Sequence, residues 1–232
     1  MKGHILLEGG SEFGGAMAAP DRRGIDLAGG GRRPDAPLFI IPAAAAPDHN
    51  DQHAGGNGVR WFKRLGARQV ILLPVVDRLS ANDPSLASMI RGAGLVYLLG
   101  GFTHYLGQTL AGSLCLQAMQ EAYAGGAVIA GSSAGAMVLC QYYYNPEGHR
   151  PEEGLNLVPN ACVIPHHNTF GARWAPGLAQ SLPGVTLVGI DEQTGMVDDG
   201  PEGQWSVHGK GVVTLYRGGS PVVYQPGEAF NL

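Results

Sequence analysis

Short apolar runs recur along the first 130 positions of the chain, separated by longer mixed segments. The runs lie at positions 5–7, 38–41, 70–73, 95–98 and 127–130. Continuous apolar runs of this length are typical of parallel strands that are covered on both faces. The pattern therefore predicts a central sheet whose strands are separated by crossover segments.

Helical segments are predicted between these strands, at positions 58–65, 84–91 and 105–124. The second has Asp83 as an N-cap residue followed by a proline, which is a typical helix start. Strand and helix thus alternate, as in a three-layer α/β fold with a doubly wound, mostly parallel sheet of the flavodoxin-like kind. In such a sheet, we expect the functional site beyond the carboxyl ends of the strands.

The pattern changes after about residue 160. Short strands separated by turn residues are predicted at positions 185–190, 196–197, 204–208, 212–216 and 222–224. We expect them to form hairpins added to the same sheet. The glycine-rich stretch at 9–31 has little periodicity and is predicted to be a loop; it lacks the lysine-serine ending and the glycine spacing of nucleotide-binding loops.

Composition narrows the class of protein. The chain has 232 residues, 44% of them hydrophobic and 15% charged, which fits a single domain over 1–232 with a large core. A net charge of -4 gives no reason to expect a nucleic-acid or membrane partner and leaves a homodimer open. The apolar run at the N-terminus stops at Glu8, too early for a signal peptide, and the three cysteines are expected to be reduced, so we expect a cytoplasmic protein.

The segment 127–139 carries the strongest functional signal. Gly131, Ser133 and Gly135 fit the G-x-S-x-G pattern at the end of a predicted strand and the start of a helix. This pattern indicates a sharp turn that exposes Ser133 as a nucleophile, with Ser132 as the rival, while a simple strand-to-helix turn is the structural alternative. The backbone N–H of Ala134 would be one oxyanion donor. The Gly100–Gly101 turn follows another strand, so the N–H of Gly101 is a candidate second donor.

A nucleophilic serine needs a base and a carboxylate that orients the base. Among eight histidines, His166 and His167 stand at the end of an apolar run, and His104 follows the double-glycine turn where it could contact substrate. Adjacent histidines without further ligands at metal-binding spacing do not indicate a metal site. Glu192 follows a short apolar run and is the best candidate acid; the alternatives are Asp191, Glu147, Glu152 and Glu153.

With these residues identified, the sequence resembles the serine peptidase family of cyanophycinase and aspartyl dipeptidase. The resemblance rests on the segments 100–101, 131–136, 164–167 and 189–192. It implies a class I glutamine-amidotransferase-like fold and a reaction that needs no cofactor and no metal. It also implies that Ser133 is the nucleophile, His167 the base, Glu192 its partner, and Gly101 with Ala134 the oxyanion hole.

The resemblance implies amide hydrolysis in small, aspartyl-containing peptides. Cyanophycin is a doubtful substrate, because Phe102 and Thr103 stand where cyanophycinase has Asp-Gln, and its arginine-rich run is reduced to Arg173. The residues expected to contact substrate are Thr103, His104, His166 and Arg173. An esterase or amidase and a non-catalytic binding module are the alternative functions. The order Ser, His, Glu argues against an α/β-hydrolase, whose acid precedes the histidine.

Overall fold

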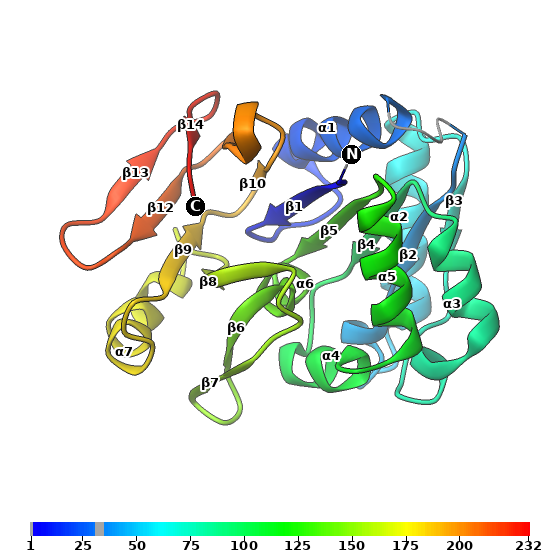
Figure 1. The fold of residues 1–232 in the computed structure, drawn as a ribbon, viewed down its shortest axis with the longest axis horizontal. Helices are drawn as coiled ribbons and strands as arrows, with labels where there is room; N and C mark the ends of the chain where they lie inside the picture. The colour runs from blue at the N-terminus through cyan, green and yellow to red at the C-terminus, as the bar shows by residue number, and fades with distance from the viewer. Residues whose placement is uncertain (1, 31–34) are drawn as a thin grey trace.

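The computed structural model describes residues 2–30 and 35–232, and its larger sheet forms the centre of the molecule (Figure 1). The strand order is β14-β11-β10-β1-β5-β4-β2-β3. The parallel part consists of β1 (His4–Glu8), β5 (Val128–Ser132), β4 (Leu95–Leu98), β2 (Leu38–Ile41) and β3 (Val70–Leu72). The antiparallel edge consists of β10 (Thr194–Val197), β11 (Trp205–Gly209) and β14 (Ala229–Phe230).

A second sheet of order β13-β12-β9-β8-β6-β7 lies beside the first. Its strands are β6 (Cys140–Asn145), β7 (Arg150–Glu153), β8 (Val158–Ile164), β9 (Thr186–Ile190), β12 (Val213–Tyr216) and β13 (Val222–Tyr224). The central strands β6, β8 and β9 are parallel. The carboxyl ends of β8 and β9 carry the histidine pair and Glu192, so this sheet supplies half of the candidate site.

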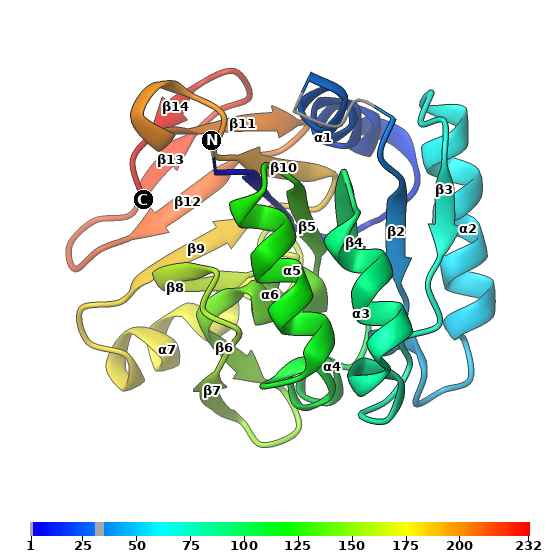
Figure 2. The same cartoon turned by 45° about the vertical axis from the view of Figure 1, so that its right-hand side comes forward.

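Helices cover both faces of the larger sheet, because successive side chains of each strand point to opposite faces (Figure 2). On one face, Ile5 and Leu7 of β1 belong to a core shared with α3 (Pro84–Arg91) and α5 (Leu114–Ala124). On the other face, Leu6 packs in a core with α1 (Ala18–Gly30) and α2 (Asp51–Arg64). The remaining helices are α4 (Thr103–Leu110), α6 (Ala134–Leu139) and α7 (Ala175–Ser181). The predicted three-layer, doubly wound α/β fold is confirmed.

The predicted strands of the first half of the chain match the structure closely, whereas the helix predicted at 58–65 begins earlier, at Asp51. Helix α3 has the predicted bounds, and the Asp83 side chain accepts hydrogen bonds from the N–H groups of Ser85 and Leu86 as an N-cap. The single helix predicted at 105–124 is two helices, α4 and α5. Gly112 lies between them with φ +63, a left-handed conformation that ends the first helix.

Two expectations about the fold are wrong, one about the C-terminal strands and one about the stretch at 9–31. The C-terminal strands do not all join one sheet, because β10, β11 and β14 extend the larger sheet whereas β9, β12 and β13 belong to the second. The stretch expected to be a loop at 9–31 contains α1; its last residue, Gly31, lies outside the described residues, as do Arg32 and Arg33. A side chain at Gly24 would contact Leu6 and Leu95 at 3.2 and 3.3 Å, so tertiary packing stabilises α1 despite its poor helix formers.

The three cysteines are free thiols and buried. Burial raises the pKa of Cys115 to about 11 and that of Cys162 to about 12, so these thiols are protonated near neutral pH. Within residues 2–30 and 35–232, no helix has the length and apolar character needed to cross a membrane.

Two carboxyl groups are fully buried beneath the end of β1. Glu8 accepts a hydrogen bond from the Tyr97 hydroxyl at 2.6 Å, and Asp21 accepts one from the Trp61 indole at 2.7 Å. The other oxygen of each carboxyl, Glu8 Oε1 and Asp21 Oδ1, is buried without a hydrogen-bond partner among the described residues. Desolvation, followed by repulsion from Asp21, raises the pKa of Glu8 well above its usual value, and desolvation raises the pKa of Asp21 to about 7.

We expect this pair to make stability fall as pH rises. The folded state keeps a proton that the unfolded carboxyls release near pH 4, so the free energy of unfolding decreases from about pH 4 upward and continues to decrease past about pH 7. Asp21→Asn removes one titrating group, keeps an acceptor for Trp61 and should be more stable than the wild type by at least about 1 kcal/mol above pH 7. Urea unfolding between about pH 5 and about pH 9 measures this difference.

Asp26→Asn is the matched control, because Asp26 is exposed on the same helix. If the Asp26 and Asp21 variants show the same pH dependence as the wild type, the pair does not share a proton in the folded state.

Candidate active site

Ser133 lies at the sharp turn between β5 and α6, in a conformation that few residues adopt. Its φ is 48° and its ψ is -110°. The backbone N–H of Ser133 donates to the carbonyl of Glu8 at 3.0 Å, which ties the turn to the end of β1. Such strain is typical of a nucleophile elbow, and the turn holds the hydroxyl above the carboxyl ends of the strands.

The glycines of the G-x-S-x-G segment allow the strand, the turn and the helix to approach closely. A Cβ at Gly131 would lie 2.5 Å from the carbonyl carbon of Gly135, and one at Gly135 would lie 2.2 Å from the carbonyl oxygen of Leu98. Both distances are far shorter than a van der Waals contact, and in each case the neighbour is backbone. The two positions therefore require glycine for this turn to form.

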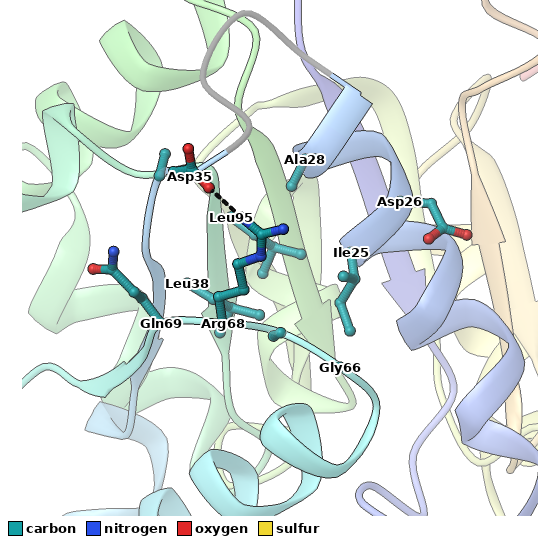
Figure 3. A pocket seen from close by; sticks show the side chains of 12 residues that line it. Ile25, Asp26, Ala28, Asp35, Leu38, Gly66, Arg68, Gln69 and Leu95 are labelled. Atoms are coloured by element: carbon teal, nitrogen blue, oxygen red, sulfur yellow. Dashed lines mark hydrogen bonds and ion pairs between the residues drawn. The ribbon is translucent and has the colours of Figure 1, made fainter.

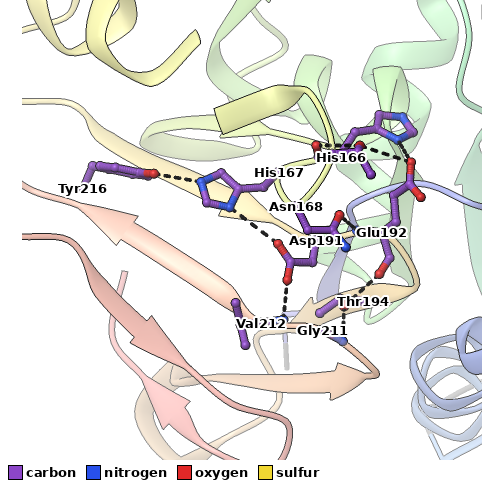
Figure 4. A network of polar contacts seen from close by, with 10 residues as sticks. His166, His167, Asn168, Asp191, Glu192, Thr194, Gly211, Val212 and Tyr216 are labelled. Atoms are coloured by element: carbon purple, nitrogen blue, oxygen red, sulfur yellow. Dashed lines mark hydrogen bonds and ion pairs between the residues drawn. The ribbon is translucent and has the colours of Figure 1, made fainter. Parts of the chain in front are cut away.

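Ser133, His166 and Glu192 form a continuous hydrogen-bonded chain. Ser133 Oγ lies 3.0 Å from His166 Nε2. His166 Nδ1 lies 2.8 Å from Glu192 Oε1, the contact drawn in Figure 4. With Nδ1 protonated, the imidazole donates to the carboxylate and accepts from the serine hydroxyl. The His166 and Glu192 side chains are 21% and 30% exposed, so the arrangement is open to solvent on one side.

Local backbone contacts fix this chain of residues. His166 has φ +49, and its N–H donates to the carbonyl of Gly9 at 2.8 Å in the loop after β1. The Glu192 N–H donates to the Asn168 side chain at 2.9 Å. The hydrogen bond from His166 lowers the pKa of Glu192, so its carboxylate stays ionised beside the imidazole.

The expectation that His167 faces Ser133 is wrong, because the imidazole of His167 points to the opposite side of the chain (Figure 4). His167 Nε2 lies 2.8 Å from the Tyr216 hydroxyl, and Nδ1 lies 3.5 Å from Asp191 Oδ1. Its ring packs over Gly189, where a Cβ would lie 2.4 Å from the imidazole. Neighbouring side chains in an extended segment point in opposite directions, so an error of one residue exchanges the two histidines.

Asp191 likewise faces His167 rather than His166, because its Oδ1 lies 3.5 Å from His167 Nδ1. Its Oδ2 accepts a hydrogen bond from the N–H of Val212 at 3.0 Å. Glu152 forms an ion pair with Arg150 in β7. Ser132 is fully buried, and its hydroxyl has no hydrogen-bond partner within residues 2–30 and 35–232. The structure thus brings neither the rival acids Asp191 and Glu152 nor the rival nucleophile into the hydrogen-bonded chain.

The expected substrate contacts are distributed unevenly. Thr103 is buried, and its hydroxyl contacts Met137 Sδ at 3.7 Å, so it packs against α6. His104 contacts the Tyr143 hydroxyl at 2.9 Å and lines a separate hollow of about 480 Å³. Arg173 is exposed, with its guanidinium 5.7 Å from the ring centre of Phe170, and that ring stacks on His166 at 4.9 Å. Arg173 is therefore linked to the imidazole of His166 through the ring of Phe170, a residue that was not expected to contact substrate.

The backbone N–H groups of Gly101 and Ala134, the expected oxyanion donors, are available to a substrate. Within the described part of the chain, neither backbone N–H has a hydrogen-bond acceptor. Gly101 has φ +137, a conformation for which glycine is needed. The neighbouring Gly100 N–H donates to Glu12 Oε1 at 3.0 Å. Glu12 was not among the predicted site residues; the signal for it is its position in the glycine-rich segment directly after the first apolar run.

No group of three or more histidine, cysteine or acidic side chains able to hold a metal ion occurs among residues 2–30 and 35–232. A second hollow of about 370 Å³ lies at the amino ends of β2, β3 and β4, the edge of the sheet opposite Ser133 (Figure 3). An exposed ion pair between Arg68 and Asp35, 2.7 Å long, borders it. This hollow is remote from the hydrogen-bonded chain.

Comparison with known proteins identifies the family. The model of peptidase family S51 matches residues 22–202 of this chain. The chain belongs to peptidase family S51. A peptidase from an acI-B1 Actinobacterium has 30% sequence identity and a TM-score of 0.89, and the match covers 100% of this chain and 98% of that one.

More distant relatives carry more specific names. Cyanophycinase of Trichormus variabilis is 28% identical over 189 residues, which are 77% of this chain and 62% of that protein. Cyanophycinase of Geminocystis herdmanii is 27% identical over 195 residues, 79% of this chain and 70% of that protein. This chain thus spans less than two thirds of the length of the Trichormus variabilis cyanophycinase. A putative peptidase E protein of Listeria monocytogenes shares the fold at 16% identity, with a TM-score of 0.60 over 97% of this chain and 99% of that one.

The elbow geometry predicts a position-specific effect of adding one methyl group. Gly135→Ala places a Cβ against the backbone of β4 and should lower the free energy of unfolding by about 1–3 kcal/mol. Gly177→Ala in α7 has open space at its Cβ and should be neutral or stabilise by up to about 1 kcal/mol. Urea unfolding of the two variants and the wild type measures both effects. Equal stabilities would contradict the close packing of the turn.

Proposed function

We propose that this chain is a serine-type peptidase that hydrolyses an amide bond through Ser133, His166 and Glu192. The observation that carries the proposal is the pair of contacts at 3.0 and 2.8 Å that joins the serine hydroxyl, the imidazole and the carboxylate. Membership of a peptidase family supports the reaction class. The triad proposed from the geometry therefore contains His166 in place of His167.

In the proposed reaction, Ser133 Oγ attacks the carbonyl carbon of the substrate while His166 Nε2 takes the hydroxyl proton. Glu192 stabilises the resulting imidazolium through the bond at Nδ1. The N–H groups of Gly101 and Ala134 stabilise the negative charge on the tetrahedral oxygen. His166 then gives the proton to the departing amine, and water, activated in the same way, releases the acyl group from Ser133.

We propose small, aspartyl-containing peptides as the substrate class. The relatives named cyanophycinase and peptidase E support this class, and Arg173 near the stacked rings of Phe170 and His166 offers a cation for a substrate carboxylate. We do not propose cyanophycin as the substrate, because Phe102 and Thr103 follow the double glycine and Thr103 is buried. An esterase or amidase would use the same nucleophile, and a binding module would not react at all.

The assignment of His166 rather than His167 as the base can be tested directly. We expect a fluorophosphonate probe to label Ser133 in the wild type and in His167→Ala, and to label His166→Ala at least about a hundredfold more slowly, because general-base assistance contributes that much. Glu192→Gln should also slow labelling. Labelling rates are followed by mass spectrometry with peptide mapping.

Ser133→Ala is the control for labelling elsewhere, and circular dichroism checks that each variant is folded. Rapid labelling of His166→Ala together with slow labelling of His167→Ala would overturn the assignment of the base. A folded wild type that does not react would exclude the peptidase and favour a binding module.

A further inference from the structure

A carboxylate that the reaction above does not use lies beside the nucleophile. A methyl group added at Gly100 would lie 2.4 Å from Glu12 Oε1 and 3.2 Å from Ser133 Cβ. Glu12 and Ser133 therefore flank the same small space in front of the double-glycine turn. The substrate carbonyl must enter this region to meet Ser133 Oγ and the N–H of Gly101.

The loop after β1 holds Glu12 in place. The residues on either side of it, Ser11 and Phe13, have φ values of +61 and +63. Phe13 packs against Tyr97 and Phe62, with ring centres 5.7 and 6.3 Å away. Non-glycine residues in this conformation need support from their surroundings, and here the aromatic cluster supplies it. Glu12 is thus held by a backbone that is anchored in the core.

Glu12 has no ion-pair partner among the residues that the structure describes. Its Oε1 accepts the Gly100 N–H, and among the residues that the structure describes no lysine, arginine or histidine forms an ion pair with it. Its second oxygen is not buried and has no hydrogen-bond partner within that same part of the chain. A carboxylate with one fixed and one available oxygen is suited to bind a small cation.

We propose that Glu12 binds the free α-ammonium group of the substrate residue whose carbonyl is attacked by Ser133. In a peptide this nitrogen is separated from the carbonyl carbon by a single Cα, so the two groups must bind within a few ångströms of each other. This inference rests on the proposed function. It makes Glu12 a specificity-determining residue of the proposed peptidase.

A second role for Glu12 would be to position the double-glycine turn through Gly100. Two substitutions separate the roles. Glu12→Gln keeps an oxygen that can accept from Gly100 but removes the negative charge, whereas Glu12→Ala removes both. If charge recognition is the role, loss of the charge in Glu12→Gln is enough to abolish selectivity for a cationic substrate, even though the contact with Gly100 is kept.

The test compares two small activated substrates, the para-nitrophenyl ester of L-alanine and its N-acetyl analogue, at a pH at which the amine is protonated. We expect the ratio of kcat/KM for the amine over the acetyl ester to fall about tenfold in Glu12→Gln, because one charge-assisted hydrogen bond is lost. Hydrolysis of the acetyl ester should change little. Glu202→Gln is the matched control, since Glu202 is an exposed carboxylate in the short helical turn Pro201–Gly203.

The outcomes separate this inference from the proposed function. An unchanged ratio in Glu12→Gln, with both esters hydrolysed, overturns ammonium binding and leaves the peptidase intact. An equal loss on both esters in both Glu12 variants also overturns it, because it shows that Glu12 positions the turn. If the wild type neither hydrolyses the esters nor reacts with the fluorophosphonate, the proposed function fails, and ammonium recognition fails with it.

Discussion

The strained backbone of Ser133 is the constraint on which the other features of the site depend. Its positive φ is maintained because the N–H of Ser133 is bound to the carbonyl of Glu8, and because Gly135 lies against the carbonyl of Leu98. The ends of β1, β4 and β5 therefore meet at one residue. Since neighbouring parallel strands have their carboxyl ends on the same edge, the loops after β1 and β4 are brought next to the nucleophile.

The loop after β1 connects the nucleophile with its partners in the second sheet. Its Gly9 carbonyl accepts the N–H of His166, and its Gly10 carbonyl accepts the N–H of Gln193, the residue after Glu192. A Cβ at Gly10 would lie 2.3 Å from the imidazole of His166, so the loop packs directly on the ring. One segment thus aligns the base and holds Glu12 at the double-glycine turn beside Ser133.

The sequence predicted the parts of the molecule that are governed by local periodicity and close packing. Apolar runs identified the parallel strands, and the G-x-S-x-G pattern identified a turn that requires glycine for steric reasons. The choice between His166 and His167 could not be made in this way, because it depends on a left-handed residue at His166 and on a backbone bond to Gly9, far away in sequence. Helix α1 was missed because contacts with Leu6 and Leu95 outweigh its unfavourable composition.

The fold of this chain is retained at low sequence identity. A fold shared with the putative peptidase E protein at 16% identity shows that few residues are needed to maintain the layers. The groups that would distinguish substrates lie instead on loops, with Glu12 after β1, Phe102 after β4 and Phe170 after β8. Loops tolerate substitution while the strands beneath them remain fixed. In the proposed peptidase, the charges on these loops would therefore help to set the substrate class. The proposed role of Glu12 is one example, because its carboxylate lies beside the nucleophile with no ion-pair partner among the described residues.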